Sequence, residues 1–404
     1  MKTNMNYQEA RDLLLTLTKP LKTETAELCK CSGRILAADL CAAENVPAFD
    51  RSPYDGYALR AEDTENASRE HPLVLQILEE IPAGNVPTKN IVPGTAAKIL
   101  TGAPIPEGAT AVIMYEKTEF TAEMVKIFET LKNGDNIVRA GEDVKKGELL
   151  AGKGSVIDPG LLGTLAAQGI AHPEVYKEPL VGIISTGSEL VDVEEEIPEG
   201  KIRNSNRYTF TAALQKDRCK TEFLGIAGDS AEEIAYLIAK GLEMCDMLLL
   251  TGGVSAGDYD LTPQAMEMAG CELLVKGVQL KPGMACCFGT AKGKLVCALS
   301  GNPSSALTNY YAVVQPAVKK MTGLAEYLPE EITLTLGNAF RKKVKGVRLL
   351  KGRLKIENGK AVMYLPSGQG NVMISSSIGC DVMAIVSGAD GPLEAGTEVK
   401  GFLV

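Results

Sequence analysis

The chain has 404 residues, of which 45% are hydrophobic, and its formal net charge at neutral pH is −9. This length suits roughly two to four domains with buried cores, and the negative charge argues against a nucleic-acid-binding protein, whose surface is usually basic. No apolar run is long enough to span a bilayer, and the N-terminus lacks the apolar core of a signal peptide, so we expect a cytoplasmic protein with no membrane partner.

Cysteine and histidine offer little chemistry in this chain. The ten cysteines are scattered, mostly within apolar segments, which is typical of reduced buried thiols. None of them shows the paired spacing of a zinc site. The two histidines, His71 and His172, lie in a charged loop and directly before a proline, where surface exposure is expected. The chemistry is therefore expected to use carboxylates, lysines, hydroxyls, backbone amides or a metal ion.

The N-terminal third predicts two structural parts. Asn6 and Glu9 are spaced as a capping box at the start of a helix over residues 6–18, and a second helix is expected at 22–29. Short apolar stretches separated by proline and glycine then predict a β domain over residues 46–139. Its expected strands are 73–77, 97–100, 111–114 and 125–128.

Residues 140–178 carry a helix near 159–169 but lack an apolar core of their own. We therefore expect them to pack with residues 1–45 as one discontinuous helical domain, into which the β domain is inserted. The C-terminal residues 326–404 again show short strands and turns, at 332–336, 354–356, 362–365 and 382–386. They predict a separate small β domain.

Residues 179–325 alternate between strands and helices, which predicts an α/β domain with a parallel sheet covered on both faces. Ser230 and Glu233 are spaced as a capping box at one of its helices. The expected strands are 180–185, 222–227, 247–250 and 295–299. Ligands of such sheets bind beyond the carboxyl ends of the strands, so the loops after these strands are candidate site loops.

The apolar strand at 247–250 runs into the glycine-rich segment Thr251 to Asp260. Gly252 and Gly253 allow backbone amides to approach an anion, while aspartates supply hard oxygen ligands, so the loop suggests phosphate with a divalent metal. A plain tight turn between strand and helix is the alternative. The segment is neither a Walker A motif nor a dinucleotide fingerprint.

Acidic residues on neighbouring loops support the metal interpretation. Glu189, Asp229, Asp258 and Asp260 together could bind Mg²⁺ through two or three carboxylates. Taken singly, Asp229 could instead cap a helix, Glu189 could be a solvated acid at a helix start, and Asp258 could be a turn residue.

Two further features concern an anion. In the segment 300–305, Pro303 is placed as a first-turn helix residue, and the free amides after it could hold an oxyanion. Lys276 and Lys281 flank a short apolar segment, and the turn at Lys281 to Gly283 could direct an ammonium group to the same edge. A solvated turn lysine is the alternative.

These motifs, taken in order, resemble the molybdopterin molybdenumtransferase family of molybdenum cofactor synthesis, typified by MoeA and the C-terminal domain of gephyrin. The resemblance covers nearly the whole chain. It is carried by the segments 52–60, 101–108, 139–143, 185–190, 251–260, 281–283 and 301–303.

The resemblance implies an elongated homodimer with a doubly wound, MogA-like molybdopterin-binding domain and a C-terminal β barrel. It also implies a Mg²⁺-dependent transferase that takes adenylylated molybdopterin and molybdate, inserts the metal and releases AMP, and whose partner could be the molybdopterin adenylyltransferase. By motif matching, the catalytic positions are Asp55, Glu189, Asp229 and Asp260, the last three of which are the expected metal ligands. The expected substrate-binding positions are Thr101, Gly252, Gly253, Ser255, Lys281, Pro282, Gly301, Asn302 and Pro303.

If the resemblance holds, Asp55 reaches the site from the partner subunit, which would make the site composite. Departures from the family pattern are found only on the oxyanion side. They are Gly277 in place of a second lysine, Met284 and Ala285 in place of Lys-Pro, Ser300 in place of proline, Asn371 in place of serine, and an unclear arginine motif with Arg348 as a candidate. Two alternatives therefore remain: a diverged relative that inserts tungsten or only hydrolyses or binds the pterin nucleotide, and a gephyrin-like scaffold without turnover.

Overall fold

The computed structural model describes the whole chain except residues 255–259, 371 and 389–390. The chain divides into two compact units by its internal contacts. The larger unit comprises Met1–Ala38, Lys153–Leu162 and His172–Val404, and the smaller comprises Asp39–Gly152 and Gly163–Ala171. Over the described residues, no helix combines the length and the apolar character needed to cross a membrane.

A seven-stranded sheet forms the centre of the larger unit, in the order β1-β17-β18-β19-β16-β12-β15. Its strands are β1 (Lys2–Asn6), β12 (Leu180–Thr186), β15 (Lys220–Ala227), β16 (Met247–Thr251), β17 (Glu272–Gln279), β18 (Cys286–Ala291) and β19 (Lys294–Leu299). The four predicted strands, β12, β15, β16 and β19, are parallel neighbours, which confirms the doubly wound α/β fold. The sheet is not wholly parallel, because β18 runs antiparallel to both neighbours and joins β19 through a short turn, as only antiparallel strands can.

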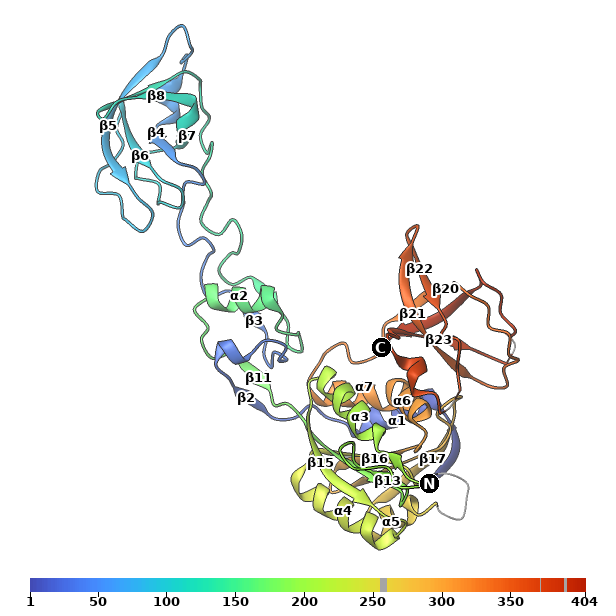
Figure 1. Ribbon diagram of the computed structural model, residues 1–404. Coiled ribbons are helices and arrows are strands. Elements are labelled where there is room, and N and C mark those ends of the chain that lie inside the picture. Colours follow the sequence, from blue (N-terminus) through green and yellow to red (C-terminus); the bar gives the residue numbers. More distant parts are fainter. Residues whose placement is uncertain (255–259, 371, 389–390) are drawn as a thin grey trace. The chain divides into compact units, whose positions relative to one another are not determined.

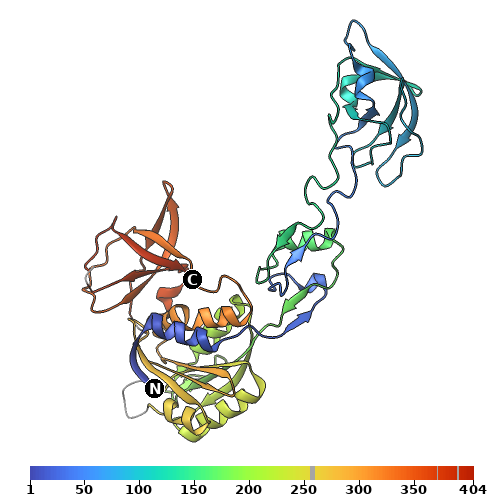
Figure 2. The same ribbon diagram turned by 180° about the vertical axis from the view of Figure 1, so that it is seen from behind.

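Helices cover both faces of this sheet (Figures 1 and 2). One face carries α1 (Tyr7–Leu17), α3 (Ser205–Lys216) and the continuous helical run α6 (Pro303–Asn309), η4 (Tyr310–Val314) and α7 (Gln315–Met321). The other face carries α4 (Ala231–Met244) and α5 (Thr262–Met268). The Ser230 hydroxyl accepts a hydrogen bond from the Glu233 amide at 3.3 Å, which confirms the predicted N-cap.

The N-terminal segment differs from the prediction of a helical domain built from residues 1–45 and 140–178. β1 pairs with β17, and Tyr7, Ala10 and Leu14 of α1 are buried in the core on the sheet. The apolar stripe of α1 was predicted, but it packs with apolar residues of the sheet strands, such as Val181 and Leu249. The remaining boundaries of the four predicted domains stay a prediction.

The helix predicted at 22–29 was also wrong. This segment contains β2 (Thr23–Thr25) and the short 3₁₀ turn η1 (Leu28–Lys30). β2 pairs antiparallel with β11 (Glu174–Tyr176), so a partner distant in sequence overrides the local helical pattern. The helix predicted near 159–169 is present as α2 (Pro159–Ala167).

The C-terminal residues form the closed β barrel that the family resemblance implied. Its strands follow the order β20 (Glu331–Leu336), β22 (Lys360–Tyr364), β21 (Arg348–Glu357), β23 (Val382–Val386) and β24 (Glu398–Leu403). The barrel has its own core around Leu350 and Met363. Leu349, Met383 and Phe402 instead join the core shared with α1 and α7, so the barrel packs on the helical face of the larger unit (Figure 1).

The smaller unit contains a six-stranded sheet in the order β7-β4-β6-β5-β9-β8. The strands are β4 (Gly56–Leu59), β5 (Leu73–Ile81), β6 (Thr95–Ile99), β7 (Ala111–Met114), β8 (Thr118–Phe120) and β9 (Met124–Ile127). Tyr57 and Leu59 point into one core and Ala58 into a second, so both faces of β4 are buried. Two strands, β3 (Leu40–Cys41) and β10 (Leu149–Ala151), pair outside this sheet.

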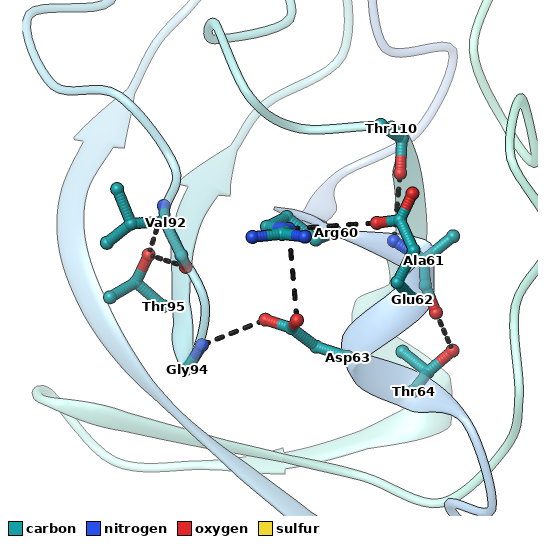
Figure 3. A network of polar contacts seen from close by, with 9 residues as sticks. All are labelled: Arg60, Ala61, Glu62, Asp63, Thr64, Val92, Gly94, Thr95 and Thr110. Atoms are coloured by element: carbon teal, nitrogen blue, oxygen red, sulfur yellow. Dashed lines mark hydrogen bonds and ion pairs between the residues drawn. The ribbon is translucent and has the colours of Figure 1, made fainter.

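Polar contacts fix the 3₁₀ turn η2 (Ala61–Thr64), which follows β4 (Figure 3). The Asp63 carboxylate accepts a hydrogen bond from the Gly94 amide at 2.8 Å and lies 3.8 Å from the Arg60 guanidinium. The Thr110 hydroxyl accepts a hydrogen bond from the Ala61 amide at 2.9 Å. These contacts satisfy backbone groups that a single turn leaves unpaired, and they tie the end of β4 to the loops that precede β6 and β7.

Candidate active site

The loops that follow the carboxyl ends of β12, β15, β16 and β19 line one pocket of about 760 Å³ in the larger unit. This is the edge at which a doubly wound sheet binds its ligands. Val372 and Ile374 add an apolar wall from the C-terminal region. The pocket brings together the predicted residues Glu189, Asp229, Gly252, Gly253, Asp260, Gly301, Asn302 and Pro303.

Two glycines determine the shape of the loop after β16. Gly252 has a φ of +102°, and a Cβ atom there would lie 2.3 Å from the carbonyl oxygen of Thr186. Gly253 has a φ of +61°, and its Cβ would lie 2.4 Å from the hydroxyl oxygen of Thr262. Both the conformation and the close approach therefore require glycine. The glycine-rich sequence is needed to pack this loop against that of β12, whatever it binds.

Buried polar atoms without partners cluster at this pocket. Thr251 Oγ1, Asn206 Oδ1 and Asp260 Oδ1 are buried and have no hydrogen-bond partner among the described residues, and all three residues line the pocket. A buried polar group left unpaired costs about 1–3 kcal/mol, so such groups call for a ligand, an ion or ordered water. Their position supports a polar ligand at this edge of the sheet.

Asp260 is a largely buried carboxylate that forms an ion pair. Its side chain is 12% exposed, and its Oδ2 atom lies 2.9 Å from Nζ of Lys276 on β17. This contact raises the pKa of Lys276 above its ordinary value, so the ammonium group is charged at neutral pH. Thus Oδ2 of the carboxylate is paired, whereas Oδ1 has no partner among the residues that the structure describes.

Asp229 and Glu189 lie on two adjacent loops of the same pocket. The Asp229 carboxylate accepts a hydrogen bond from the Ser188 hydroxyl. Because Ser230 caps α4, the alternative that Asp229 serves as the N-cap is wrong. Glu189 folds over Gly187, where a Cβ atom would lie 2.3 Å from its Oε2 atom. Both acids are exposed at the pocket, and the Ser188 hydroxyl orients Asp229.

These three carboxylates suit Mg²⁺ in their chemistry, because they are hard oxygen ligands and one oxygen of Asp260 has no hydrogen-bond partner in the part of the chain that the structure describes. They do not form a complete cage: across the described part of the chain, no group of three or more His, Cys, Asp or Glu residues is placed to hold a metal ion. Mg²⁺ is commonly held by one or two carboxylates together with waters and substrate phosphates. The pocket fits that kind of site.

On the opposite side of the pocket, Gly301 to Pro303 form the turn from β19 into α6. The Asn302 amide donates to the Ser300 hydroxyl at 3.2 Å, and the Asn206 side chain donates to the Gly301 carbonyl at 2.9 Å. A Cβ atom on Gly301 would lie 3.5 Å from the Cα atom of Gly252. The predicted anion loop and the glycine loop are therefore direct neighbours.

Lys281 and Pro282 are not among the pocket-lining residues. The Lys281 side chain is exposed, while its backbone amide donates to Val347 and its carbonyl accepts from Leu349, at 3.0 and 2.9 Å. The backbone of Lys281 is thus hydrogen-bonded to the segment that leads into β21 of the barrel. The predicted role of Lys281 in substrate binding stays a prediction. The predictions for Ser255, Asp258 and Asn371 lie outside the described residues.

Sequence reasoning missed a buried lysine. Lys351 on β21 is 2% exposed, and its Nζ donates to the hydroxyls of Ser304 at 2.6 Å and Ser377 at 2.9 Å. Burial lowers the pKa of Lys351. It lies behind the first turn of α6, whereas Arg348, the residue considered from the sequence, donates to the Gln369 carbonyl at 3.1 Å. No sequence signal marks a strand lysine as buried, so only the barrel packing reveals it.

Asp55 and Thr101 form a separate site in the smaller unit. The Asp55 Oδ1 atom accepts hydrogen bonds from the amide and the hydroxyl of Thr101, both at 2.7 Å. These bonds hold the pKa of Asp55 below its ordinary value. The sequence predicted the two residues separately as active-site positions. In the structure, Thr101 holds the Asp55 carboxylate in one orientation.

The packing of Gly252 predicts a specific loss of stability on substitution. Gly252→Ala and the control Gly270→Ala both replace a glycine of positive φ, but only Gly252 has atoms in the way of a Cβ. We expect about 1–3 kcal/mol of destabilisation in the control and roughly 2 kcal/mol more for Gly252→Ala. Urea denaturation followed by far-UV circular dichroism measures both. Equal losses in the two variants would show that the loop relaxes freely.

Comparison with known proteins agrees with this geometry. Residues 5–169 match the family described as MoeA N-terminal region (domain I and II), and residues 182–320 match a probable molybdopterin binding domain. The molybdopterin molybdenumtransferase of Staphylococcus aureus is 35% identical over 379 residues, which cover 93% of this chain and 90% of the relative. Its counterpart from Staphylococcus epidermidis is 34% identical over 367 residues, covering 91% and 87% of the two chains.

Two solved structures have folds similar to that of this chain. The molybdopterin biosynthesis MoeA protein of Pyrococcus horikoshii superposes with a TM-score of 0.84 and 32% identity, covering 99% of this chain and 100% of that chain. A molybdenum cofactor biosynthesis protein from Pyrococcus furiosus shares the fold, with a TM-score of 0.60 and 19% identity over 99% and 100% of the chains. The pocket, the domain matches and these relatives together show that the chain belongs to the molybdopterin molybdenumtransferase (MoeA) family of molybdenum cofactor biosynthesis.

Proposed function

We propose that this protein inserts molybdenum into adenylylated molybdopterin and releases AMP. The observation that carries the proposal is Asp260, a carboxylate that lines the pocket and has one buried oxygen without a hydrogen-bond partner among the described residues. A metal-assisted reaction at a phosphate needs such a carboxylate beside amides that can receive phosphate oxygens. The names of the relatives support the same reaction class.

AMP release requires cleavage of a phosphoanhydride: water adds to phosphorus and one phosphate leaves with the bridging oxygen. Such a reaction depends on positioning and on charge stabilisation more than on a strong base. Gly252 and Gly253 line the pocket, and a glycine turn there would let backbone amides approach the phosphate. The rigid packing of this loop against Thr186 would hold the phosphate without reorganisation.

Asp260, with Glu189 or Asp229, would hold Mg²⁺ on the adenylyl side of the pocket. The bound ion would neutralise charge on the phosphate oxygens during cleavage. The carboxylates would hold the ion in place, and the Ser188 hydroxyl orients the Asp229 carboxylate.

Molybdate, the second substrate, is a tetrahedral dianion that a protein binds much as it binds phosphate. The turn from Gly301 to Pro303 would receive it through backbone amides at the start of the helical run from α6 to α7. Asn206 holds the Gly301 carbonyl and so orients this turn. Lys351, whose Nζ atom donates to the Ser304 hydroxyl, would supply a cationic group near this turn.

The Asp55–Thr101 pair supports a composite site in a homodimer, in which Asp55 acts from the partner subunit. Thr101 holds the carboxylate in one orientation and favours its charged form. A fixed, charged and exposed carboxylate suits a contribution to a neighbouring subunit's site. The enzyme that adenylylates molybdopterin is the expected supplier of the substrate.

Turnover tests the proposal directly. Purified protein with adenylylated molybdopterin, Mg²⁺ and molybdate is expected to release AMP and to yield pterin-bound molybdenum. Asp260→Asn should lower AMP release by about 100-fold or more, since the metal loses a charged ligand, while Glu267→Gln on the exposed face of α5 should not. Metal incorporation from tungstate alone would indicate a tungsten enzyme, and wild-type protein without AMP release would indicate a binding scaffold.

Mixing two inactive variants tests the composite site. Asp55→Asn and Asp260→Asn homodimers should each be inactive, whereas exchange of subunits would create heterodimers with one site free of both substitutions. Activity should therefore reappear after the two variants are mixed under conditions that exchange subunits. If mixed dimers are demonstrated by mass spectrometry and remain inactive, both residues act within one subunit.

A further inference from the structure

Lys276 and Asp260 form an ion pair at the pocket. Lys276 lies on β17 opposite Cys287, whose side chain belongs to the core beneath α4 and α5. Asp260 stands two residues before α5, on that same face of the sheet. The topology therefore places Lys276 within reach of Asp260, the carboxylate proposed to hold the metal.

The backbone explains why the cation is at 276 and not at 277. Gly277 has a φ of +76°, a conformation that L side chains rarely adopt, although a Cβ atom there would meet nothing closer than 3.6 Å. Conformation, more than space, thus disfavours a lysine at this position. Lys276 follows Val275, whose side chain packs in the core on the other face of the sheet, so the lysine lies on the face that carries Asp260.

The ion pair changes what Asp260 offers to a cation. Nζ of Lys276 engages Oδ2, so a divalent ion gains only Oδ1 or must displace the ammonium group. The two opposite charges also cancel, which weakens the attraction of Asp260 for free Mg²⁺. An arriving phosphate brings negative charge back to the pocket and restores that attraction.

We infer that Lys276 acts as a built-in competitor for the metal position at Asp260, so that the protein takes up its divalent cation together with the phosphate of the nucleotide and only weakly beforehand. This inference rests on the metal site of the proposed function. Lys276 is accordingly a positioning residue, which acts through Asp260 and sets the order of metal and nucleotide binding.

Mn²⁺ binding to the full-length protein tests this inference without turnover. The electron paramagnetic resonance signal of free Mn²⁺ gives its affinity with and without AMP. Without AMP, Lys276→Gln and Lys276→Met should bind Mn²⁺ about tenfold more tightly than wild type, whereas Lys276→Arg, which keeps the charge, should not. The control Lys292→Gln removes a lysine paired with Glu243, outside the pocket, and should change the affinity by less than about twofold.

AMP should tighten Mn²⁺ binding strongly in wild type and much less in Lys276→Gln. Thermal unfolding confirms that each variant is folded, and the methionine variant replaces the glutamine variant if that one fails to fold. Unchanged or weaker Mn²⁺ binding in both neutral variants, while Asp260→Asn abolishes binding, would overturn the inference and leave the metal site intact. Mn²⁺ binding that is equal in wild type and Asp260→Asn would instead contradict the metal site itself.

Discussion

The close approach of Gly252 to the carbonyl of Thr186 is the constraint on which the pocket depends. It joins the loop after β16 to the loop after β12, and Gly301 packs on the other side of Gly252. Because any Cβ at Gly252 would strike backbone, these loops can meet only if that residue is glycine. This contact therefore brings together the loop that carries Glu189 and the turn from Gly301 to Pro303 before α6.

Several buried polar atoms without hydrogen-bond partners among the described residues also line the pocket. Thr251, Asn206 and Asp260 each contribute a buried polar atom without a partner among the residues described. Lys276 satisfies half of the Asp260 carboxylate, and Lys351 is satisfied by two serine hydroxyls behind the anion turn. Charges of both signs are therefore held in place before the substrate arrives, as expected of a site that stabilises a transition state by preorganised electrostatics.

The parts of this account that were predicted from sequence are those governed by local pattern. The strands β12, β15, β16 and β19, the Ser230 cap and the C-terminal strands follow from periodicity and capping. The motifs placed the acids and glycines on loops at the ends of these strands, where the structure shows one pocket.

The missed features depend on contacts between distant segments. The polar strand β1 pairs with β17, and β2, where a helix was expected, pairs with β11. The ion pair of Lys276 with Asp260 needs a strand register that no spacing reveals. Lys351 appears as an ordinary strand lysine until the barrel packs against α6.

A crystal structure of the full-length protein with Mg²⁺ and adenylylated molybdopterin tests the central claim most directly. The account predicts the adenylyl phosphate against the loop of Gly252 and Gly253, a metal ion on Asp260 and the pterin end directed toward the turn at Gly301. Nucleotide bound elsewhere on the protein, with this pocket free of ligand and metal, would contradict it.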